Sequence, residues 1–403
     1  MAKPVAVFAF LGLLAMSAGV LADMAPVLPV PADPAATLRV PPGFRISVFA
    51  RLDAGGGDYF RGPRFMAFGQ DGHLYLSLGL DNKVVMLPDA DHDGRADDVV
   101  LVSDRLNAPQ GLAFVGGRLL VANQDGVVRL EQQHGRWPAS EATPVIANLP
   151  SGGHTLKTIK QGPDGYLYVN VGSSCNVCTE QNPLRATILR YSVDGKSAGG
   201  FKADRGMPAA VWATGLRNSE GFAWHPQTGA MYATNNGADM RSDKKGGTAL
   251  DDLPPEHLNQ IDPGAHYGWP HCWGEHVVDP NFPGPAGFCE TMQPPVMTFP
   301  AHAAPLGMTF LDKATFPGEY RSDALVALHG SWNRRQPSGY KLVRVHFEAG
   351  KPVKTSDFAS GWLSERGAWG RPVDVVTGPD GAVYLSDDRA GMIYRITYRS
   401  AKP

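Results

Sequence analysis

The sequence predicts an all-β fold, a six-bladed β-propeller built of four-stranded antiparallel blades. A Gly-containing turn followed by a short run of alternating apolar and polar residues recurs six times along the 403-residue chain. Three of the recurrences are spaced by roughly 45 to 65 residues, which matches propeller blades with their loops. Amphipathic helix patterns are nearly absent, and 47 Gly and 34 Pro suit a chain with many turns.

The recurring unit has the pattern of a β-hairpin. Period-2 alternation after an Asp-Gly or Gly-Gly turn predicts two paired strands. The six turn-centred stretches are 69–79, 115–130, 162–172, 225–237, 320–330 and 378–387. A leading strand often precedes the turn, at 63–70, 109–115, 219–226, 305–311 and 371–378, and a further strand often follows, at 82–88, 186–193, 340–347 and 391–398. An array of β-sandwiches is the alternative fold, although sandwiches do not repeat one turn-centred unit this often.

One long interval interrupts the repeat. Residues 239–303 are rich in Pro, Gly, Trp and His. We interpret them as a long loop insert of one domain spanning 23–403, because long loops in compact domains are usually functional. Loops at one face of a propeller converge on the central channel, so polar residues from different blades can meet there.

The N-terminus predicts export. Residues 1–22 combine Lys3, a short apolar run and small residues before the expected cleavage site after Ala22, which is the pattern of a secretory signal peptide. An uncleaved membrane anchor is the alternative, but the apolar run barely reaches the roughly 20 residues that span a bilayer. The formal net charge of -2 lacks the basic excess that nucleic acid requires. We therefore expect a periplasmic or secreted protein without a membrane span after cleavage.

Export also affects how the four cysteines are interpreted. An even number in an oxidising compartment suggests disulfides, and we pair them locally, Cys175 with Cys178 and Cys272 with Cys289, although three connectivities are open. A redox, metal or c-type haem role for the first pair is the alternative. Haem attachment needs a His directly after the second Cys, where this chain has Thr179.

Several polar and charged residues are expected to gather around His154 at one mouth of the channel. His154 lies in the loop leading into 162–172, which we expect to be an inner strand with its turn. Other polar residues precede or follow the inner strands of different blades: Arg64, Arg217, Asn218, Asn236, His329, Arg334 and Arg371. Because Arg offers bidentate geometry to carboxylates, this set predicts a site for a polyanionic small molecule. The alternative is that each Arg makes a structural bond within its own blade.

The chain resembles the pyrroloquinoline quinone (PQQ) dependent soluble sugar dehydrogenases of the glucose/sorbosone dehydrogenase type, and most of all the sorbosone and pyranose dehydrogenase branch. The resemblance covers essentially the whole mature chain. Its most specific stretches are "GSSCNVCTE", "LRNSEGFAWHP", "NQIDPGAHYGWP", "FPGEYRSDALVALHGSWNR" and "GRPVDVVTGPDGAVYLSDD", which occur in this order.

The resemblance implies PQQ and Ca²⁺ as cofactors and assigns roles to matching residues. His154, ten residues before Asp164 of a Pro-Asp-Gly turn, matches the family's base. The family's Arg-Asn pair beside the quinone matches Arg217 and Asn218, and an arginine before the last blade matches Arg371. The family's calcium is held largely by backbone carbonyls, which match Gly237 and Ala238, and Ca²⁺ takes six to eight oxygen ligands.

Three departures from the family's pattern stand out. Val373 replaces a second arginine, and His329 stands about where the glucose-oxidising branch has a cofactor lysine. Arg334, Arg64 and His329 are the expected substitutes as charge partners. Ser173 replaces an acidic residue, which leaves open what orients the His154 ring.

The implied reaction is oxidation of an aldose, a pyranose or a sugar-derived aldehyde, with His154 as general base and hydride transfer to the quinone. Arg217 and calcium would stabilise the developing negative charge. A cytochrome or a quinone is the expected class of electron acceptor. In the insert, Tyr267, Trp269 and Trp273 could stack on a sugar ring, or belong to the core.

Two other functions and one further metal site stay open. A calcium-dependent lactonase-like hydrolase would need several carboxylate or Asn ligands converging on one ion, and a non-catalytic ligand-binding propeller would not respond to a change at His154. Asp89, Asp91 and Asp93 occupy alternate positions before Gly94, which resembles the first half of a calcium loop. Val100 stands where the loop's final Glu is expected, so a solvated acidic turn is the alternative.

Overall fold

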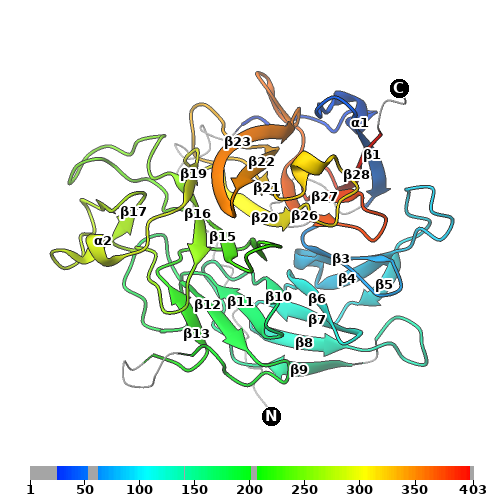
Figure 1. Cartoon of the computed structure of the whole chain (residues 1–403), viewed down its shortest axis with the longest axis horizontal. Coiled ribbons are helices and arrows are strands. Elements are labelled where there is room, and N and C mark those ends of the chain that lie inside the picture. Colours follow the sequence, from blue (N-terminus) through cyan, green and yellow to red (C-terminus); the bar gives the residue numbers. More distant parts are fainter. Residues whose placement is uncertain (1–24, 53–61, 140, 201–206, 400–403) are drawn as a thin grey trace, which may run out of the picture.

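The computed structural model of the protein describes residues 25–52, 62–139, 141–200 and 207–399. In this part of the chain, six four-stranded antiparallel sheets are arranged around a common centre (Figure 1). This confirms the predicted six-bladed propeller and rules out the array of sandwiches. The predicted signal peptide, 1–22, lies outside the described residues. Among the described residues, no helix is both long and apolar enough to cross a membrane.

Each of the first three blades uses four consecutive strands, and the first strand lies nearest the channel. The first blade consists of β2 (Met66–Phe68), β3 (Leu74–Leu78), β4 (Lys83–Leu87) and β5 (Val100–Ser103). The second consists of β6 (Leu112–Val115), β7 (Arg118–Asn123), β8 (Gly126–Leu130) and β9 (Ala142–Ile146). The third consists of β10 (Ile159–Gln161), β11 (Leu167–Val171), β12 (Thr187–Tyr191) and β13 (Val211–Thr214).

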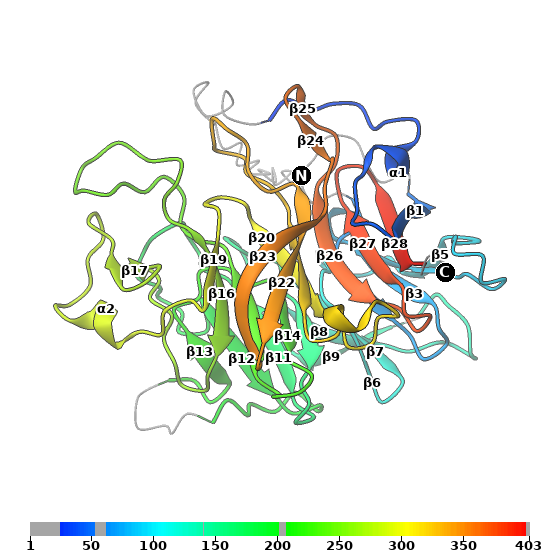
Figure 2. The ribbon, with the colours of Figure 1, turned by 45° about the horizontal axis from the view of Figure 1, so that its top comes forward.

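The fourth blade contains two strands from the long interval. It consists of β14 (Phe222–Trp224), β15 (Met231–Asn235), β16 (Glu256–Ile261) and β19 (Met297–Phe299). Range 239–303 is therefore more than loops, because β16 and β19 complete this blade. Between them, β17 (Cys272–Trp273), β18 (Val277–Val278) and α2 (Phe288–Thr291) form a projection at the side of the ring (Figures 1 and 2).

The last two blades close the ring. The fifth consists of β20 (Pro305–Phe310), β21 (Ala324–Leu328), β22 (Lys341–Glu348) and β23 (Lys351–Ala359). The sixth consists of β26 (Pro372–Thr377), β27 (Val383–Asp387), β28 (Met392–Tyr398) and, on its outer edge, β1 (Phe44–Arg51). Pairing of β1 with β28 joins the two ends of the described chain and covers an edge strand. The short elements are α1 (Pro34–Thr37), β24 (Leu363–Ser364), β25 (Gly367–Ala368), and 3₁₀ turns at Gly79–Asp81 and Gly318–Tyr320.

A repeated pattern of side-chain hydrogen bonds explains why three blades share the Asp-Gly turn. In each, the turn aspartate accepts a bond from the backbone N–H two residues later and from the hydroxyl of a tyrosine four residues later. The turn glycine has a positive φ of 74° to 82°, which residues with a Cβ rarely adopt. The three sets are Asp71, Gly72 and Tyr75; Asp164, Gly165 and Tyr168; and Asp380, Gly381 and Tyr384.

The core lies between the blades, and the channel lies at their inner edges. All residues of the second strands β3, β11, β15, β21 and β27 are buried, because each is covered on both faces by neighbouring blades. The first strands neighbour one another around the channel, for example β2 with β6 and β6 with β10. The stretch 162–172, expected to be an inner strand with its turn, is therefore the second strand of its blade. The innermost strand, next to the channel, is β10. His154 precedes β10, so its loop opens at one end of the channel.

The structure contains both predicted disulfides. Cys175 is bonded to Cys178, and Cys272 to Cys289. The second bridge joins β17 to α2 within the projection. The pairing closes the three-way ambiguity that the sequence leaves open, and no described cysteine is free.

Candidate active site

A cavity of about 620 Å³ lies at the end of the channel where the loops before the inner strands converge. It collects residues from all six blades. Eight of the predicted site residues line it: Arg64, His154, Arg217, Asn218, Asn236, Gly237, His329 and Arg371. Ala238 and Arg334 are not among the lining residues.

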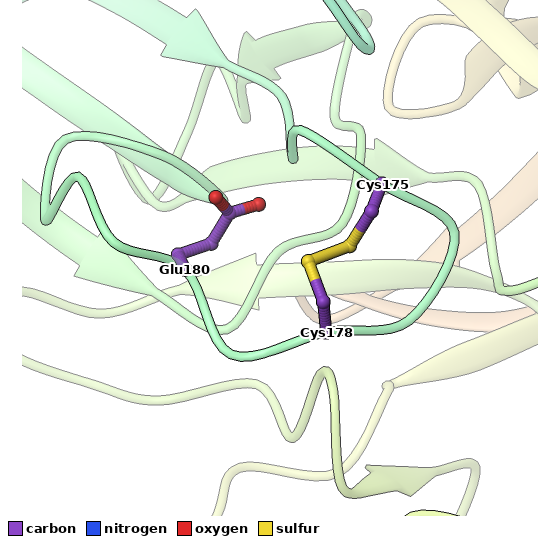
Figure 3. Close-up of side chains that lie close together, drawn as sticks. All are labelled: Cys175, Cys178 and Glu180. Atoms are coloured by element: carbon purple, nitrogen blue, oxygen red, sulfur yellow. A yellow bond between two sulfur atoms is a disulfide. The ribbon is translucent and has the colours of Figure 1, made fainter.

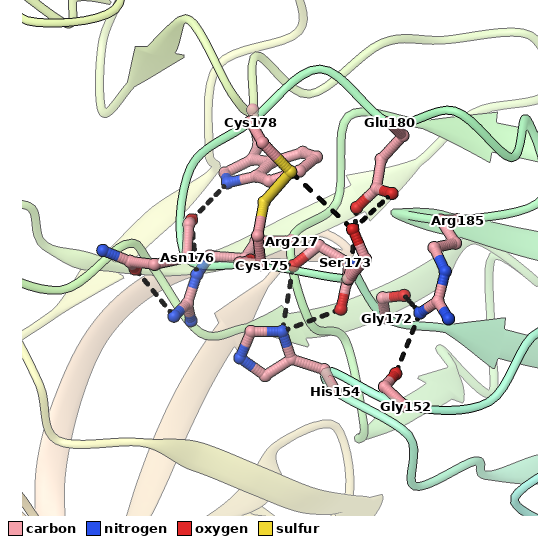
Figure 4. Close-up of a disulfide and its surroundings, with 12 residues drawn as sticks. Gly152, His154, Gly172, Ser173, Cys175, Asn176, Cys178, Glu180, Arg185 and Arg217 are labelled. Atoms are coloured by element: carbon pink, nitrogen blue, oxygen red, sulfur yellow. Dashed lines mark hydrogen bonds between the residues drawn. A yellow bond between two sulfur atoms is a disulfide. The ribbon is translucent and has the colours of Figure 1, made fainter. Parts of the chain in front are cut away.

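His154 is oriented by Ser173. Its Nδ1 lies 2.9 Å from the hydroxyl oxygen and 3.2 Å from the carbonyl oxygen of Ser173 (Figure 4). A carbonyl can only accept, so Nδ1 must carry the ring proton. The lone pair then lies on Nε2, the nitrogen on the opposite side of the ring. The serine that replaces an acidic residue in the sequence pattern thus fixes the tautomer that a general base needs.

The environment keeps this imidazole neutral. Burial, followed by the positive charge of Arg217, lowers the pKa of His154 from 6.5 to about 4. The backbone contact with Ser173 acts in the opposite direction but does not outweigh them. At neutral pH, His154 is therefore a hydrogen-bond acceptor at Nε2 and not a cation.

Two cations, the buried Lys157 and the partly buried Arg185, hold the loop that carries His154. Lys157 donates to the carbonyls of Gln124, Pro150 and Thr155 at 2.5 to 3.0 Å, and its side chain is inaccessible to solvent. Arg185 donates to the carbonyls of Ser151, Gly152 and Gly172. Gly172 leaves no room for a side chain, because a Cβ there would lie 2.5 Å from the His154 Cβ. The loop is thus fixed by its backbone, which leaves the imidazole to face the cavity.

Arg217 is a buried ion-pair partner at the cavity wall. Its Nη2 lies 3.0 Å from Asp239 Oδ2, and its other N–H groups bond Asn176 and the carbonyl of Asn236. Asp239 also contacts His302 Nδ1 at 3.3 Å and accepts a bond from Asn333. Burial alone would raise the pKa of Asp239, but His302, Arg217 and Asn333 together hold it below its usual value. The guanidinium is therefore fixed in place, with its charge balanced by one carboxylate.

Sequence reasoning missed three carboxylates of the cavity wall: Asp239, Glu220 and Glu256. Glu220 accepts bonds from Arg64, Gln110 and Asn218. Glu256 accepts from the backbone N–H groups of Gly237 and Ala304, and burial raises its pKa to about 7. Asp239 in "NNGAD" and Glu220 in "LRNSEG" stand next to predicted site residues, so the sequence could have indicated both. Nothing in the sequence shows that Glu256, in the third strand of its blade, reaches the channel.

Arg64 and His329 share one partner. Arg64 Nη1 lies 2.8 Å from Asp388, and His329 Nε2 lies 3.0 Å from both oxygens of the same carboxylate. Burial and Arg371 lower the pKa of His329 to about 4, so the ring donates a neutral N–H to Asp388. The predicted charge partners at these two positions are thus already paired within the protein. Arg371 donates to the carbonyls of His329 and Gly330, next to this group.

Arg334 lies apart from the cavity. Its guanidinium bonds Asp252 and the carbonyls of Ala301 and Gln336. The structure therefore does not bring it together with the other predicted residues, and its role as a charge partner of the cofactor has no support here. Among the three aromatic residues proposed for sugar stacking, Tyr267, Trp269 and Trp273 are all buried and none lines the cavity.

The polar groups of the cavity fit PQQ and Ca²⁺. Within the described chain, the side-chain oxygens of Asn218 and Asn236 are buried without a hydrogen-bond partner. An unpaired buried oxygen is costly, and a bound donor or a hard cation would satisfy it. Gly237 and Glu256 line the same cavity, and their oxygens are further candidate ligands for a cation. Arg217 and Arg371 line the same cavity and supply positive charge for a polycarboxylate.

Two other groups of residues could in principle hold a metal. Glu180 lies beside Cys175 and Cys178 (Figure 3), but the two sulfurs are bonded to each other and cannot act as thiolates. Carboxylate oxygens of Asp89, Asp91 and Asp93 lie within 4.8 Å of one another. They also accept bonds from the backbone N–H groups of Gly94, Asp93 and Arg95, as in an acidic turn. A second calcium site at this turn stays a prediction.

The chain matches known proteins over most of its length. Residues 57–399 match the family model described as TrAA12-like. A curated but uncharacterised protein of Borreliella burgdorferi is 28% identical over 380 residues, which cover 90% of this chain and 91% of that protein. A PQQ-dependent pyranose dehydrogenase of Coprinopsis cinerea is 25% identical over 356 residues, covering 74% of this chain and 47% of that longer protein.

Solved structures share the fold. The holo form of the PQQ domain of the Coprinopsis cinerea pyranose dehydrogenase has a TM-score of 0.73 and 22% identity, and covers 93% of this chain and 100% of that chain. A calcium structure of a Trichoderma reesei protein of carbohydrate-active enzyme family AA12 has a TM-score of 0.73 and 20% identity, with the same coverage. At these identities, the likeness establishes the propeller and its blade order.

Proposed function

The chain belongs to the TrAA12-like family, and from that premise we propose that it is a PQQ- and calcium-dependent dehydrogenase of an aldose, a pyranose or a sugar-derived aldehyde. The observation that carries this proposal is the neutral His154, whose proton is fixed on Nδ1 and whose Nε2 is left as a base in the cavity. The disulfides support a periplasmic or secreted location.

Each of the residues named below has a separate role in the proposed reaction. His154 Nε2 accepts the hydroxyl proton of the substrate. Arg217 would stabilise the negative charge that the hydride acceptor gains, and its fixed position avoids reorganisation at that moment. Arg371 and Asn218 would hold the cofactor, and Asn236, Gly237 and Glu256 would supply oxygens to calcium. PQQ supplies the hydride acceptor when bound, with calcium as its Lewis acid.

A reconstitution experiment tests the proposal. The purified protein, freed of bound PQQ and metal with EDTA, is mixed with PQQ and CaCl₂ and assayed for reduction of dichlorophenolindophenol with a panel of aldoses, pyranoses and aldehydes. Dye reduction that requires both additions is expected. A protein that reduces no dye with any of these substrates, yet hydrolyses a lactone or only binds PQQ, would contradict the proposal.

The pH dependence of the reaction should reflect the lowered pKa of His154. The base must be unprotonated, so a group with a pKa of about 4 stays active at pH 5, where an ordinary histidine would be mostly protonated. At saturating CaCl₂, which keeps Glu256 ionised, we expect kcat/KM to be nearly flat from pH 7 to 5 and to fall as the pH drops through about 4. Initial rates are measured at short times, and preincubation at each pH shows whether acid inactivates the protein. The fall in kcat/KM that is due to His154 can then be separated from inactivation.

Ser173→Asp provides the matched variant. A carboxylate next to Nδ1 stabilises the imidazolium, so the acidic limb of kcat/KM should move to higher pH. If kcat/KM falls at the same acidic pH in both proteins, or falls near pH 6.5 in the wild type, the assignment of His154 as the titrating base is contradicted.

A further inference from the structure

A four-residue loop closed by a disulfide contacts both functional groups of the cavity. Cys175 and Cys178 are bonded to each other, with only Asn176 and Val177 between them. In Figure 4 the loop lies over Arg217 on one side and next to the Ser173–His154 contact on the other. The proposed function gives no role to the disulfide or to Asn176.

Asn176 binds the Arg217 side chain at two points. Its carbonyl oxygen accepts a bond from Arg217 Nε at 3.1 Å, and its Oδ1 accepts a bond from Arg217 Nη2 at 2.9 Å. The same Oδ1 accepts from the backbone N–H of Asp239 at 2.8 Å, and Nδ2 donates to the Asp239 carbonyl at 2.8 Å. One residue therefore holds the guanidinium and the backbone of its carboxylate partner in a fixed relation.

The loop also fixes the partner of His154. Ser173 Oγ donates its proton to the carbonyl of Cys175 at 2.7 Å, which leaves that oxygen free to accept from His154 Nδ1. Glu180 holds Ser174, the residue between Ser173 and Cys175, because its carboxylate accepts from the N–H and the hydroxyl of Ser174 at 2.6 and 2.8 Å. The backbone position of Cys175 thus determines the direction of the serine proton.

We propose that the disulfide-closed loop Cys175–Cys178 is the positioning element of this site, with Asn176 as the positioning residue for Arg217 and the Cys175 carbonyl as the positioning group for Ser173. The chemical importance of this placement rests on the proposed function of His154 and Arg217. The loop has no regular secondary structure to define its backbone. The covalent link removes conformations in which Asn176 would point away from the guanidinium.

The experiment compares the two disulfides of the chain. Cys175→Ser/Cys178→Ser opens the small loop, and Cys272→Ser/Cys289→Ser opens the larger loop in the projection, which is the matched control. The control bridge spans 17 residues instead of 3, so its loss should lower the melting temperature more. The small-loop variant should lose less melting temperature but about tenfold or more in kcat, because small displacements of positioned groups are costly.

A second readout does not need the cofactor. In ¹⁵N-labelled protein without PQQ or calcium, the Arg217 Nε–H resonance, assigned by its loss in Arg217→Lys, reports the bond to the Asn176 carbonyl. Its hydrogen exchange should accelerate by about tenfold or more in the small-loop variant, as expected for a bond that opens locally, and stay unchanged in the control. Asn176→Ala should lower kcat, because it removes both the Oδ1 acceptor of Arg217 and the Nδ2 donor to the Asp239 carbonyl.

The outcomes separate the two proposals. Unchanged Arg217 exchange in Cys175→Ser/Cys178→Ser overturns the positioning role, whether or not the enzyme is active. Equal kcat losses in both disulfide variants also overturn it, because the effect would then follow stability alone. If Arg217 exchange accelerates in the small-loop variant and not in the control, but the wild-type protein oxidises no sugar or aldehyde, only the proposed function is overturned.

Discussion

Replacing His154 with Gln should lower kcat by about 10³-fold, within the range that general base catalysis contributes. The amide of Gln can donate to the Ser173 carbonyl as Nδ1–H does, so the loop should keep its conformation. It cannot accept a proton, however, and the reaction loses its base. The measurement is steady-state dye reduction by the reconstituted protein, together with the dissociation constant of PQQ, which should change little because the cofactor's charge partners are untouched.

Two controls define this result. His134 is exposed and far from the cavity in sequence and in fold, so His134→Gln should leave kcat unchanged. His154→Ala should lose activity to a similar degree and regain part of it with added imidazole, which can enter the space of the missing ring. A His154→Gln enzyme that retained a tenth of the wild-type kcat or more would show that another group, or water, takes the proton.

Most of the fold could be predicted because the blades repeat their local chemistry. The Asp71, Asp164 and Asp380 turns use the same bonds, and the alternation around them marks the first and second strands of three blades. Two features could not be predicted in the same way. The pairing of β1 with β28 joins residues more than 300 positions apart, and β16 lies within a segment whose composition is that of a loop.

The candidate site was predictable in its residue types but not in its pairing. The family resemblance assigned His154 by its spacing from the turn, and Arg217 and Asn218 by a matching Arg-Asn pair. Which partner a side chain takes depends on the meeting of distant blades, and this decides its chemistry. Ser173 orients His154 although it is no acid, and Arg64 is paired with Glu220 and Asp388 from two other blades. A count of cations at the channel mouth therefore overestimates the charge that is left for a ligand.

Arg64→Met should destabilise the protein by about 3–5 kcal/mol, the cost of leaving buried charges without a partner. The Arg64 side chain is 1% exposed, and its guanidinium bonds Asp388, Glu220 and Gln110. These partners belong to three other blades, so one side chain links four blades across the channel. Burial alone would raise the pKa of Asp388, but His329, Arg64 and Arg371 hold it far below its usual value, so the carboxylate is charged at pH 7.

A double-mutant cycle distinguishes lost charge balance from lost packing. If the buried Asp388 charge causes the destabilisation, Arg64→Met/Asp388→Asn should unfold at a higher denaturant concentration than Arg64→Met, since the uncompensated anion is gone. Arg335→Met is the matched control, because the Arg335 side chain is 80% exposed and its ion pair with Asp251 lies in solvent. It should leave the unfolding midpoint unchanged. If Arg64→Met instead unfolds like the wild type and only weakens PQQ binding, Arg64 serves the ligand and not the closure of the channel.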